Sequence, residues 1–136
     1  MTGPLHRLIN ELDYPCLAGE ELAAFVTGPG ARVLFLSGDP ATNLETNDVA
    51  AILPELVKAF PGRFEPAVVD RAEEDATRER FQVWPVPSLL FFQDGRMTGV
   101  ISKVRDWDDY LGEIHAILQG TSASANIIAR DGSVRT

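Results

Sequence analysis

The side chains that could support catalysis are few, because the chain contains one cysteine and two histidines. Cys16 has no second cysteine with which to form a disulfide inside the chain, and no basic neighbour or helix start in its sequence favours a reactive thiolate. We interpret it as a small buried apolar residue; the alternative is a redox enzyme that uses this single thiol. His6 and His115 are too few and too isolated to form a metal site with Cys16, so neither a metal nor a cofactor is predicted. The sequence contains no phosphate-binding, dinucleotide-binding or nucleophile-elbow motif.

Acidic side chains are the second group of candidates. The formal net charge is −8, and the residues after position 120 contribute +1 from two arginines and one aspartate, so the first 120 residues carry −9. Such a charge repels the phosphates of nucleic acids and favours a basic protein partner. Asp39, Glu45 and Asp48 flank the same end of the predicted sheet and are candidate ligands for the basic side chains of such a partner, arginine among them. As ordinary turn and capping residues they also need no partner.

Two of the predicted helices begin with clustered acids. The first cluster is Glu-Glu-Asp at positions 73–75 with Glu79, and the second consists of Asp106, Asp108 and Asp109 with Glu113. Negative charges at a helix N-terminus complement the helix dipole. We expect both clusters to form solvated helix faces, and the alternative is that one of them binds a partner.

The stretch from 83 to 96 is the most informative part of the chain. Its apolar run from Ser88 to Phe92 is typical of a strand covered on both faces. Pro87 stands at the first strand position, where its missing N–H removes no hydrogen bond from the sheet. Asp94-Gly95 then favours a tight type I′ turn into a return strand over 96–102.

Periodicity and turn signals place the other elements. We predict helices over 5–12, 19–27, 46–60 (containing Pro54), 72–81 (capped by Asp70) and 106–118 (capped by Asp106), strands over 32–37 and 64–70, and a loop over 38–45. In the last helix, the predicted inward residues are Trp107, Leu111, Ile114 and Leu118. Right-handed crossovers between parallel strands then give an α/β fold whose mixed sheet of four strands, or five, has helices on both faces. Residues 1–120 are predicted to form one domain, and 121–136 a disordered tail.

Four features resemble the thioredoxin-like fold over about residues 31–118. They are the apolar strand 33–36, the helix containing Pro54, the Val86-Pro87-Ser88 step into a strand, and the Asp94-Gly95 hairpin followed by an amphipathic helix. The resemblance implies a three-layer α/β/α sandwich with a mixed central sheet and a cis bond before Pro87. The helices over 5–27 are an addition to that fold.

The chain departs from thioredoxins at the residues that carry their chemistry. Thioredoxins have a Cys-x-x-Cys pair where family spacing places Thr46 and Val49, and a buried acid where this chain has Leu34. Because neither Thr46 nor Val49 can form a thiolate, disulfide exchange by this route is excluded. We therefore predict that the protein is not an enzyme.

A cysteine-less domain with these additions is similar to the hydrogenase-expression proteins of the HupG/HyaE type over about residues 5–118. The residues that suggest this lie at 33–40 (Val-Leu-Phe-Leu-Ser-Gly-Asp-Pro), 53–56 (Leu-Pro-Glu-Leu), 60–61, 80–83, 87 and 99–101. The resemblance implies a chaperone in the maturation of nickel-iron uptake hydrogenases. Its implied partner is the hydrogenase small-subunit precursor, bound through the twin-arginine signal peptide before export, and other maturation proteins are further expected partners.

The thioredoxin-like resemblance also implies where such a peptide binds. Domains of this fold commonly hold an extended peptide beside the cis-proline, so Trp84, Val86 and Pro87 are the predicted groove residues. Thr46 is predicted to face Pro87 from the helix, where thioredoxins have a cysteine. The alternative for Trp84 is a packed cover on the sheet edge.

Two other functions fit the same sequence. One is the redox enzyme that uses Cys16, and the other is a general structural adaptor in hydrogenase assembly. The start of the chain lacks the pattern of a secretory signal, and no apolar run is long enough to span a bilayer. A cytoplasmic protein without a membrane span is therefore expected.

Overall fold

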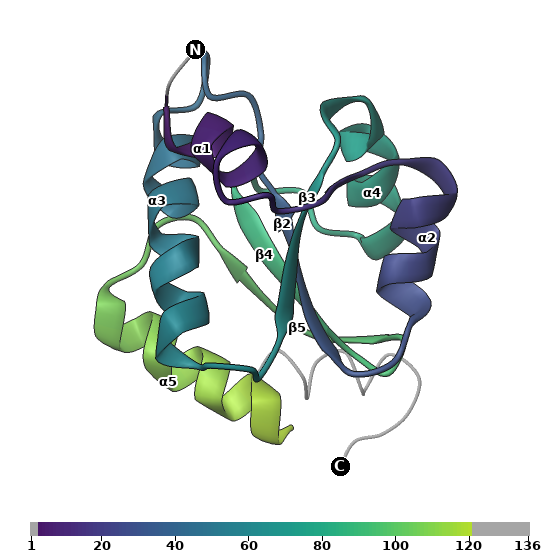
Figure 1. The fold of residues 1–136 in the computed structure, drawn as a ribbon, viewed down its shortest axis with the longest axis vertical. Coiled ribbons are helices and arrows are strands. Elements are labelled where there is room, and N and C mark those ends of the chain that lie inside the picture. The colour runs from purple at the N-terminus through teal and green to yellow at the C-terminus, as the bar shows by residue number, and fades with distance from the viewer. Residues whose placement is uncertain (1–2, 121–136) are drawn as a thin grey trace.

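The computed structural model describes residues 3–120 of the chain, and Figure 1 shows how its elements are arranged. In chain order they are α1 (Pro4–Asn10), β1 (Cys16–Leu17), α2 (Gly19–Thr27), β2 (Ala31–Leu36), α3 (Leu44–Ala59), β3 (Glu65–Val69), the 3-10 helix η1 (Arg71–Glu73), α4 (Glu74–Phe81), β4 (Ser88–Gln93), β5 (Arg96–Ser102) and α5 (Trp107–Gln119). The predicted disorder of 121–136 lies outside the described residues.

The strands form one mixed sheet in the order β1-β3-β2-β4-β5. β1, β3 and β2 are parallel, whereas β4 is antiparallel to β2 and β5 is antiparallel to β4. The predicted hairpin at the sheet edge is confirmed, and both residues of its turn, Asp94 and Gly95, have positive φ. The fifth strand is β1, whose two residues are too few to produce a recognisable sequence pattern.

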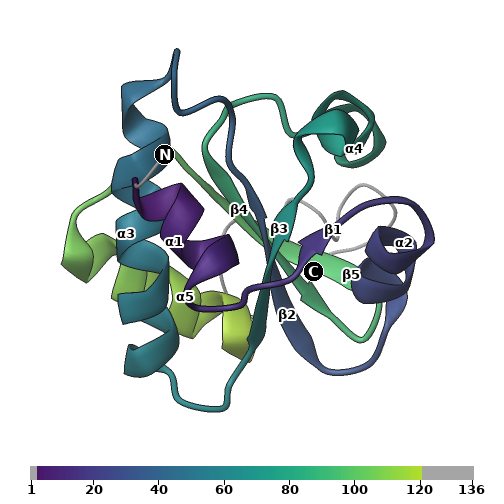
Figure 2. The ribbon, with the colours of Figure 1, turned by 45° about the horizontal axis from the view of Figure 1, so that its top comes forward.

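Helices cover both faces of this sheet, which gives the three predicted layers (Figures 1 and 2). The helices α1, α3 and α5 lie on one face, where the core includes Leu8, Leu53, Leu56, Tyr110 and Ile114. The helices α2 and α4 lie on the other face, over a second core that includes Leu22, Val26, Leu34 and Leu36. Because both faces are covered, β2 and β4 are apolar without alternation.

Several local predictions need correction. Trp107 is 43% exposed, and Tyr110 and Ile117 occupy the inward positions of α5 together with Ile114. Asp106 stands at the N-cap of α5, but its side chain makes no capping hydrogen bond. Leu111 and Leu118 are partly buried against the same core, as predicted, whereas Trp107 lies in the first turn, which follows the exposed segment 103–105.

The helix predicted over 72–81 is divided in two. Asp70 does cap, since its Oδ1 accepts a hydrogen bond from the Ala72 N–H at 2.9 Å, but it caps the 3-10 helix η1. The α-helix α4 begins at Glu74. Glu74 is buried, whereas its acidic neighbours Glu73 and Asp75 are half-buried and exposed, respectively.

Candidate binding site at the cis-proline edge

The peptide bond between Val86 and Pro87 is cis, as predicted. Pro87 is buried, and its carbonyl accepts a hydrogen bond from the Lys103 N–H at 2.8 Å, which holds it against the end of β5. Val86 is half-buried, whereas Trp84 is 51% exposed. Of the three predicted groove residues, Trp84 and Val86 therefore present surface, and Pro87 shapes the backbone below it.

Asn43 connects the cis-proline loop to the start of α3. Its Nδ2 donates a hydrogen bond to the Val86 carbonyl at 2.9 Å, and its Oδ1 accepts one from the Glu45 N–H at 2.9 Å as the N-cap of the helix. The sequence predicts a turn-rich loop at position 43 but not this link, because Val86 lies 43 residues away in the chain. A capping signal was the available clue.

The loop after β2 packs directly on Val86. Gly38 has φ +79°, and a Cβ atom at this position would lie 2.9 Å from Val86 Cγ2. Both the backbone conformation and the close approach require glycine. The loop over 37–43 and the cis-proline loop therefore form one continuous edge.

Thr46 and Val49 are buried in the structure. The Thr46 side chain is fully buried, and its hydroxyl donates a hydrogen bond to the Ser37 carbonyl at 2.7 Å. Val49 is 1% exposed and belongs to the core. Thr46 was included among the predicted partner-binding residues, but its burial puts it out of reach of a partner; its contact instead ties α3 to the end of β2.

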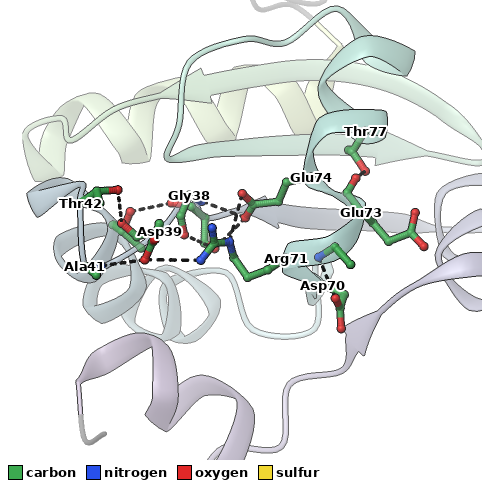
Figure 3. Close-up of polar contacts among 12 residues, drawn as sticks. Gly38, Asp39, Ala41, Thr42, Asp70, Arg71, Glu73, Glu74 and Thr77 are labelled. Atoms are coloured by element: carbon green, nitrogen blue, oxygen red, sulfur yellow. Dashed lines mark hydrogen bonds and ion pairs between the residues drawn. The ribbon is translucent and has the colours of Figure 1, made fainter.

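Glu74 forms the centre of a polar network that sequence analysis missed (Figure 3). Its side chain is 9% exposed, and Oε2 accepts hydrogen bonds from the Ser37 hydroxyl at 3.1 Å and the Gly38 N–H at 3.0 Å. The cluster at 73–75 was predicted to be a solvated helix start. Its middle member instead fixes the loop after β2, and no local pattern distinguishes it from its neighbours.

Asp39 is one of the three predicted arginine ligands, and it already faces an arginine of the chain. Its Oδ1 lies 3.4 Å from Nη1 of Arg71, whose Nε lies 3.4 Å from Glu74 Oε1. The same Asp39 oxygen accepts a hydrogen bond from the Ala41 N–H at 2.9 Å. Figure 3 shows Arg71 lying between the two carboxylates.

The other two predicted arginine ligands differ from each other. Glu45 is half-buried, and its Oε1 accepts a hydrogen bond from the Val104 N–H at 3.1 Å. Asp48 is exposed, and within residues 3–120 no hydrogen bond or ion pair involves its side chain. Glu45 therefore has a structural role, whereas the side chain of Asp48 is exposed to solvent.

Exposed apolar side chains gather along the same edge. Leu44 is 89% exposed, and its two neighbours bind the Val86 carbonyl and the Val104 N–H, respectively. Val104 itself is 38% exposed, and Trp84, two residues before Val86, is 51% exposed. We call Leu44, Trp84, Val86 and Val104 the apolar edge.

The thiol lies elsewhere. Cys16 is exposed rather than buried as predicted, and it is on β1, which the strands β3 and β2 separate from β4. Partial desolvation of the sulfur raises the pKa of the thiol, and so does the carboxylate of Asp70, whose Oδ2 lies 3.9 Å from Sγ. The reactive thiolate is therefore disfavoured at neutral pH.

Residues 3–120 offer neither a metal centre nor a membrane-spanning helix. No group of three or more histidine, cysteine, aspartate or glutamate side chains there could hold a metal ion. No helix in the same range is long and apolar enough to cross a membrane.

Residues 5–110 match the family described as hydrogenase-1 expression protein HyaE. The chain is 48% identical over 119 residues to the hydrogenase expression/formation protein HupG of Rhodobacter capsulatus, with 86% of each chain covered. It is 46% identical over 123 residues to HoxO of Azotobacter vinelandii, with 88% of this chain and 81% of that relative covered.

Solved structures agree with the fold. A putative hydrogenase expression/formation protein HupG from Rhodopseudomonas palustris CGA009 is 39% identical, with a TM-score of 0.50 over 77% of this chain and 96% of that one. Mitochondrial thioredoxin 3 from Saccharomyces cerevisiae is 16% identical, with a TM-score of 0.62 over 74% of this chain and 93% of that one. The fold is therefore thioredoxin-like, as the resemblance implied.

Proposed function

Because this chain belongs to the HyaE family of hydrogenase expression proteins, we propose that it is a non-enzymatic chaperone for the small-subunit precursor of a nickel-iron hydrogenase. In this proposal it binds the twin-arginine signal peptide of the precursor in the cytoplasm, before export. Other hydrogenase maturation proteins are further proposed partners.

The chemistry of the cis-proline edge supports a binding role over catalysis. Thr46 and Val49 lie buried where thioredoxins carry their cysteines, so the edge has no thiol. The described thiol, Cys16, lies on β1 with a raised pKa. Neither location provides the accessible thiolate that a redox enzyme of this fold needs.

One observation carries the proposal: exposed apolar side chains and acidic side chains occupy the same edge. Leu44 leaves 89% of its surface in water, although apolar surface is favourably buried. Asp39 belongs to the loop that precedes Leu44, and Asp48 follows one turn later in α3. A signal peptide with an arginine pair beside an apolar segment complements both properties.

The proposed binding mode depends on which groups of this edge already make hydrogen bonds within the protein. Asn43 occupies the Val86 carbonyl, so a peptide that paired with this carbonyl would have to displace the Asn43 side chain. The side chains of Leu44, Trp84 and Val86 need no such displacement. We propose that they carry the main contact, with Pro87 shaping the loop and Asp39, Glu45 and Asp48 forming its acidic rim.

Leu44→Asp tests this surface, measured as binding of a fluorescently labelled signal peptide by anisotropy. We expect at least a tenfold loss of affinity, because an apolar contact is replaced by a charge that must be desolvated. Leu12→Asp is the matched control: Leu12 is also exposed, at 45%, but it follows α1. Its substitution should leave the affinity within about twofold of the unmodified protein.

A pull-down distinguishes the proposed function from its alternatives. The precursor should bind, whereas the small subunit without its signal segment should not. Equal binding of both forms would favour a structural adaptor. Reduction of insulin disulfides that disappears in Cys16→Ser would favour the redox enzyme instead.

A further inference from the structure

The contacts of Arg71 show that Asp39 and Glu74 together accept a guanidinium group. The Nη1 of Arg71 lies 3.4 Å from Asp39 Oδ1, and its Nε lies 3.4 Å from Glu74 Oε1 (Figure 3). Two different nitrogens therefore face two different carboxylates. A planar guanidinium can bridge two such acceptors, whereas a single ammonium group is a compact point charge.

Glu74 is the part of this arrangement that most needs a cation. Its Oε2 is held by Ser37 and Gly38, while its Oε1 has Arg71 as its one partner among the described residues. The carboxylate is largely buried, and a buried charge is costly unless it is paired. This oxygen therefore requires a guanidinium or another donor, from the chain itself or from a partner.

Arg71 holds this place loosely. Both of its contacts are 3.4 Å long, beyond the usual range of 2.7 to 3.2 Å for N–H···O hydrogen bonds, and its side chain is 52% exposed. On the Arg71 side both pairs are open to water and salt, which screen them, and ordering this long side chain costs entropy. An incoming guanidinium with further contacts nearby can replace it.

The apolar edge, which lies beside Asp39, can supply those further contacts to an incoming peptide. The Asp39 carbonyl accepts hydrogen bonds from the N–H groups of Thr42 and Asn43, at 3.1 and 2.8 Å, which closes the loop and brings the start of α3 back to Asp39. The next residue, Leu44, is the most exposed large apolar side chain among the described residues. Gly38, whose N–H binds Glu74, packs on Val86 of the same apolar edge.

We propose that Arg71 occupies, in the unbound protein, the place that an arginine of the bound precursor segment takes on Asp39 and Glu74. Arg71 is then an internal competitor, and the apolar segment that follows the partner's arginine lies over Leu44. This inference rests on the proposed function. It adds where the peptide binds and in which direction its chain runs across the edge.

The test is Arg71→Gln, with affinity measured by anisotropy for a labelled signal peptide and for the same peptide with both arginines replaced by lysine. Removal of the competitor should raise affinity for the arginine peptide about two- to fivefold. The lysine peptide should gain less, because it cannot bridge the two carboxylates. Arg7→Gln is the matched control, since Arg7 of α1 makes an exposed pair with Glu11 and its substitution changes the net charge equally.

Asp39→Asn in the Arg71→Gln background should abolish the gain for the arginine peptide. Arg71→Lys, which keeps the charge, should give a smaller gain than Arg71→Gln and serves as the second variant if thermal unfolding shows that the glutamine disrupts the fold. If the original protein binds the peptide and removal of Arg71 leaves affinity unchanged or lowers it, this inference is wrong and the proposed function stands. If no form of the protein binds the peptide, both fall.

Discussion

The starts of α4 and α5 carry nearly the same acidic signature, yet one is built into the structure and the other is not. In α4, Glu74 is buried against the end of β2. In α5, Asp106, Asp108 and Asp109 are all exposed, and the N-cap side chain makes no capping hydrogen bond. Acidic residues at a helix start therefore have a structural role in α4 and remain solvated in α5.

The difference comes from what each helix start meets. The start of α4 lies against Gly38, whose N–H would otherwise be buried without a partner, and against the Ser37 hydroxyl, which also contacts the Gly38 carbonyl at 3.0 Å. The start of α5 follows the exposed segment 103–105 and faces solvent. A carboxylate is buried where the surrounding fold offers hydrogen-bond donors, and it stays in water elsewhere.

Glu74→Ala should separate the two helix starts most clearly. The substitution leaves the Gly38 N–H buried without its acceptor, and it removes one of the two acceptors near the Ser37 hydroxyl, which keeps the Gly38 carbonyl at 3.0 Å. Because both lost hydrogen bonds are to a charged group, we expect a loss of about 3 kcal/mol in the free energy of unfolding. Urea denaturation followed by circular dichroism measures it. Asp75→Ala, an exposed neighbour in the same helix start, is the control and should change stability by no more than about 0.5 kcal/mol. Equal effects would mean that Glu74 is as dispensable as the surface acids.

Gly38→Ala tests the other end of the same contact. Alanine is strained at φ +79° and its Cβ would clash with Val86, so we expect a loss of about 2 kcal/mol. Gly112→Ala in α5 is the control, because nothing lies within 4 Å of a Cβ at that position and the helix favours alanine. A stable Gly38→Ala protein would show that the loop can move away from the cis-proline edge.

The smallest effects are expected in α5. Asp108→Asn or Asp109→Asn removes a charge that interacts with the helix dipole, so each should cost about 0.5 kcal/mol. The loss should shrink at high salt, because exposed charges are screened. Urea denaturation at two salt concentrations checks this, and a large, salt-independent loss would contradict the contrast between the two helices.

The cis-proline edge shows how far local patterns reach. The strand after Pro87 and the Asp94-Gly95 hairpin were predicted from residue types within a few positions of each other, and both are confirmed. The partners of Asn43, Glu45 and Glu74 were not predictable in this way. They lie 43, 59 and 36 residues away in the chain, and no spacing rule connects side chains at such distances.

Cys16 and Trp107 illustrate the same limit from the opposite direction. Both were predicted to be inward by residue type or by helical spacing, and both are exposed. Leu17, which follows Cys16, and Tyr110, three residues after Trp107, are buried instead. A pattern gives the period of burial, but its phase depends on the strand or helix against which the residue packs.

The sequence by itself determined the α/β class, the edge hairpin, the absence of a Cys-x-x-Cys pair and the acidic charge, because these follow from residue types, short-range spacing and counting. The tertiary structure alone decided which acids are structural and which stay in solvent. Burial and pairing of a carboxylate depend on donors that distant segments supply, as Ser37 and Gly38 do for Glu74. The same folding brings Asp39, Arg71 and Leu44 to one edge, where the proposed partner binds.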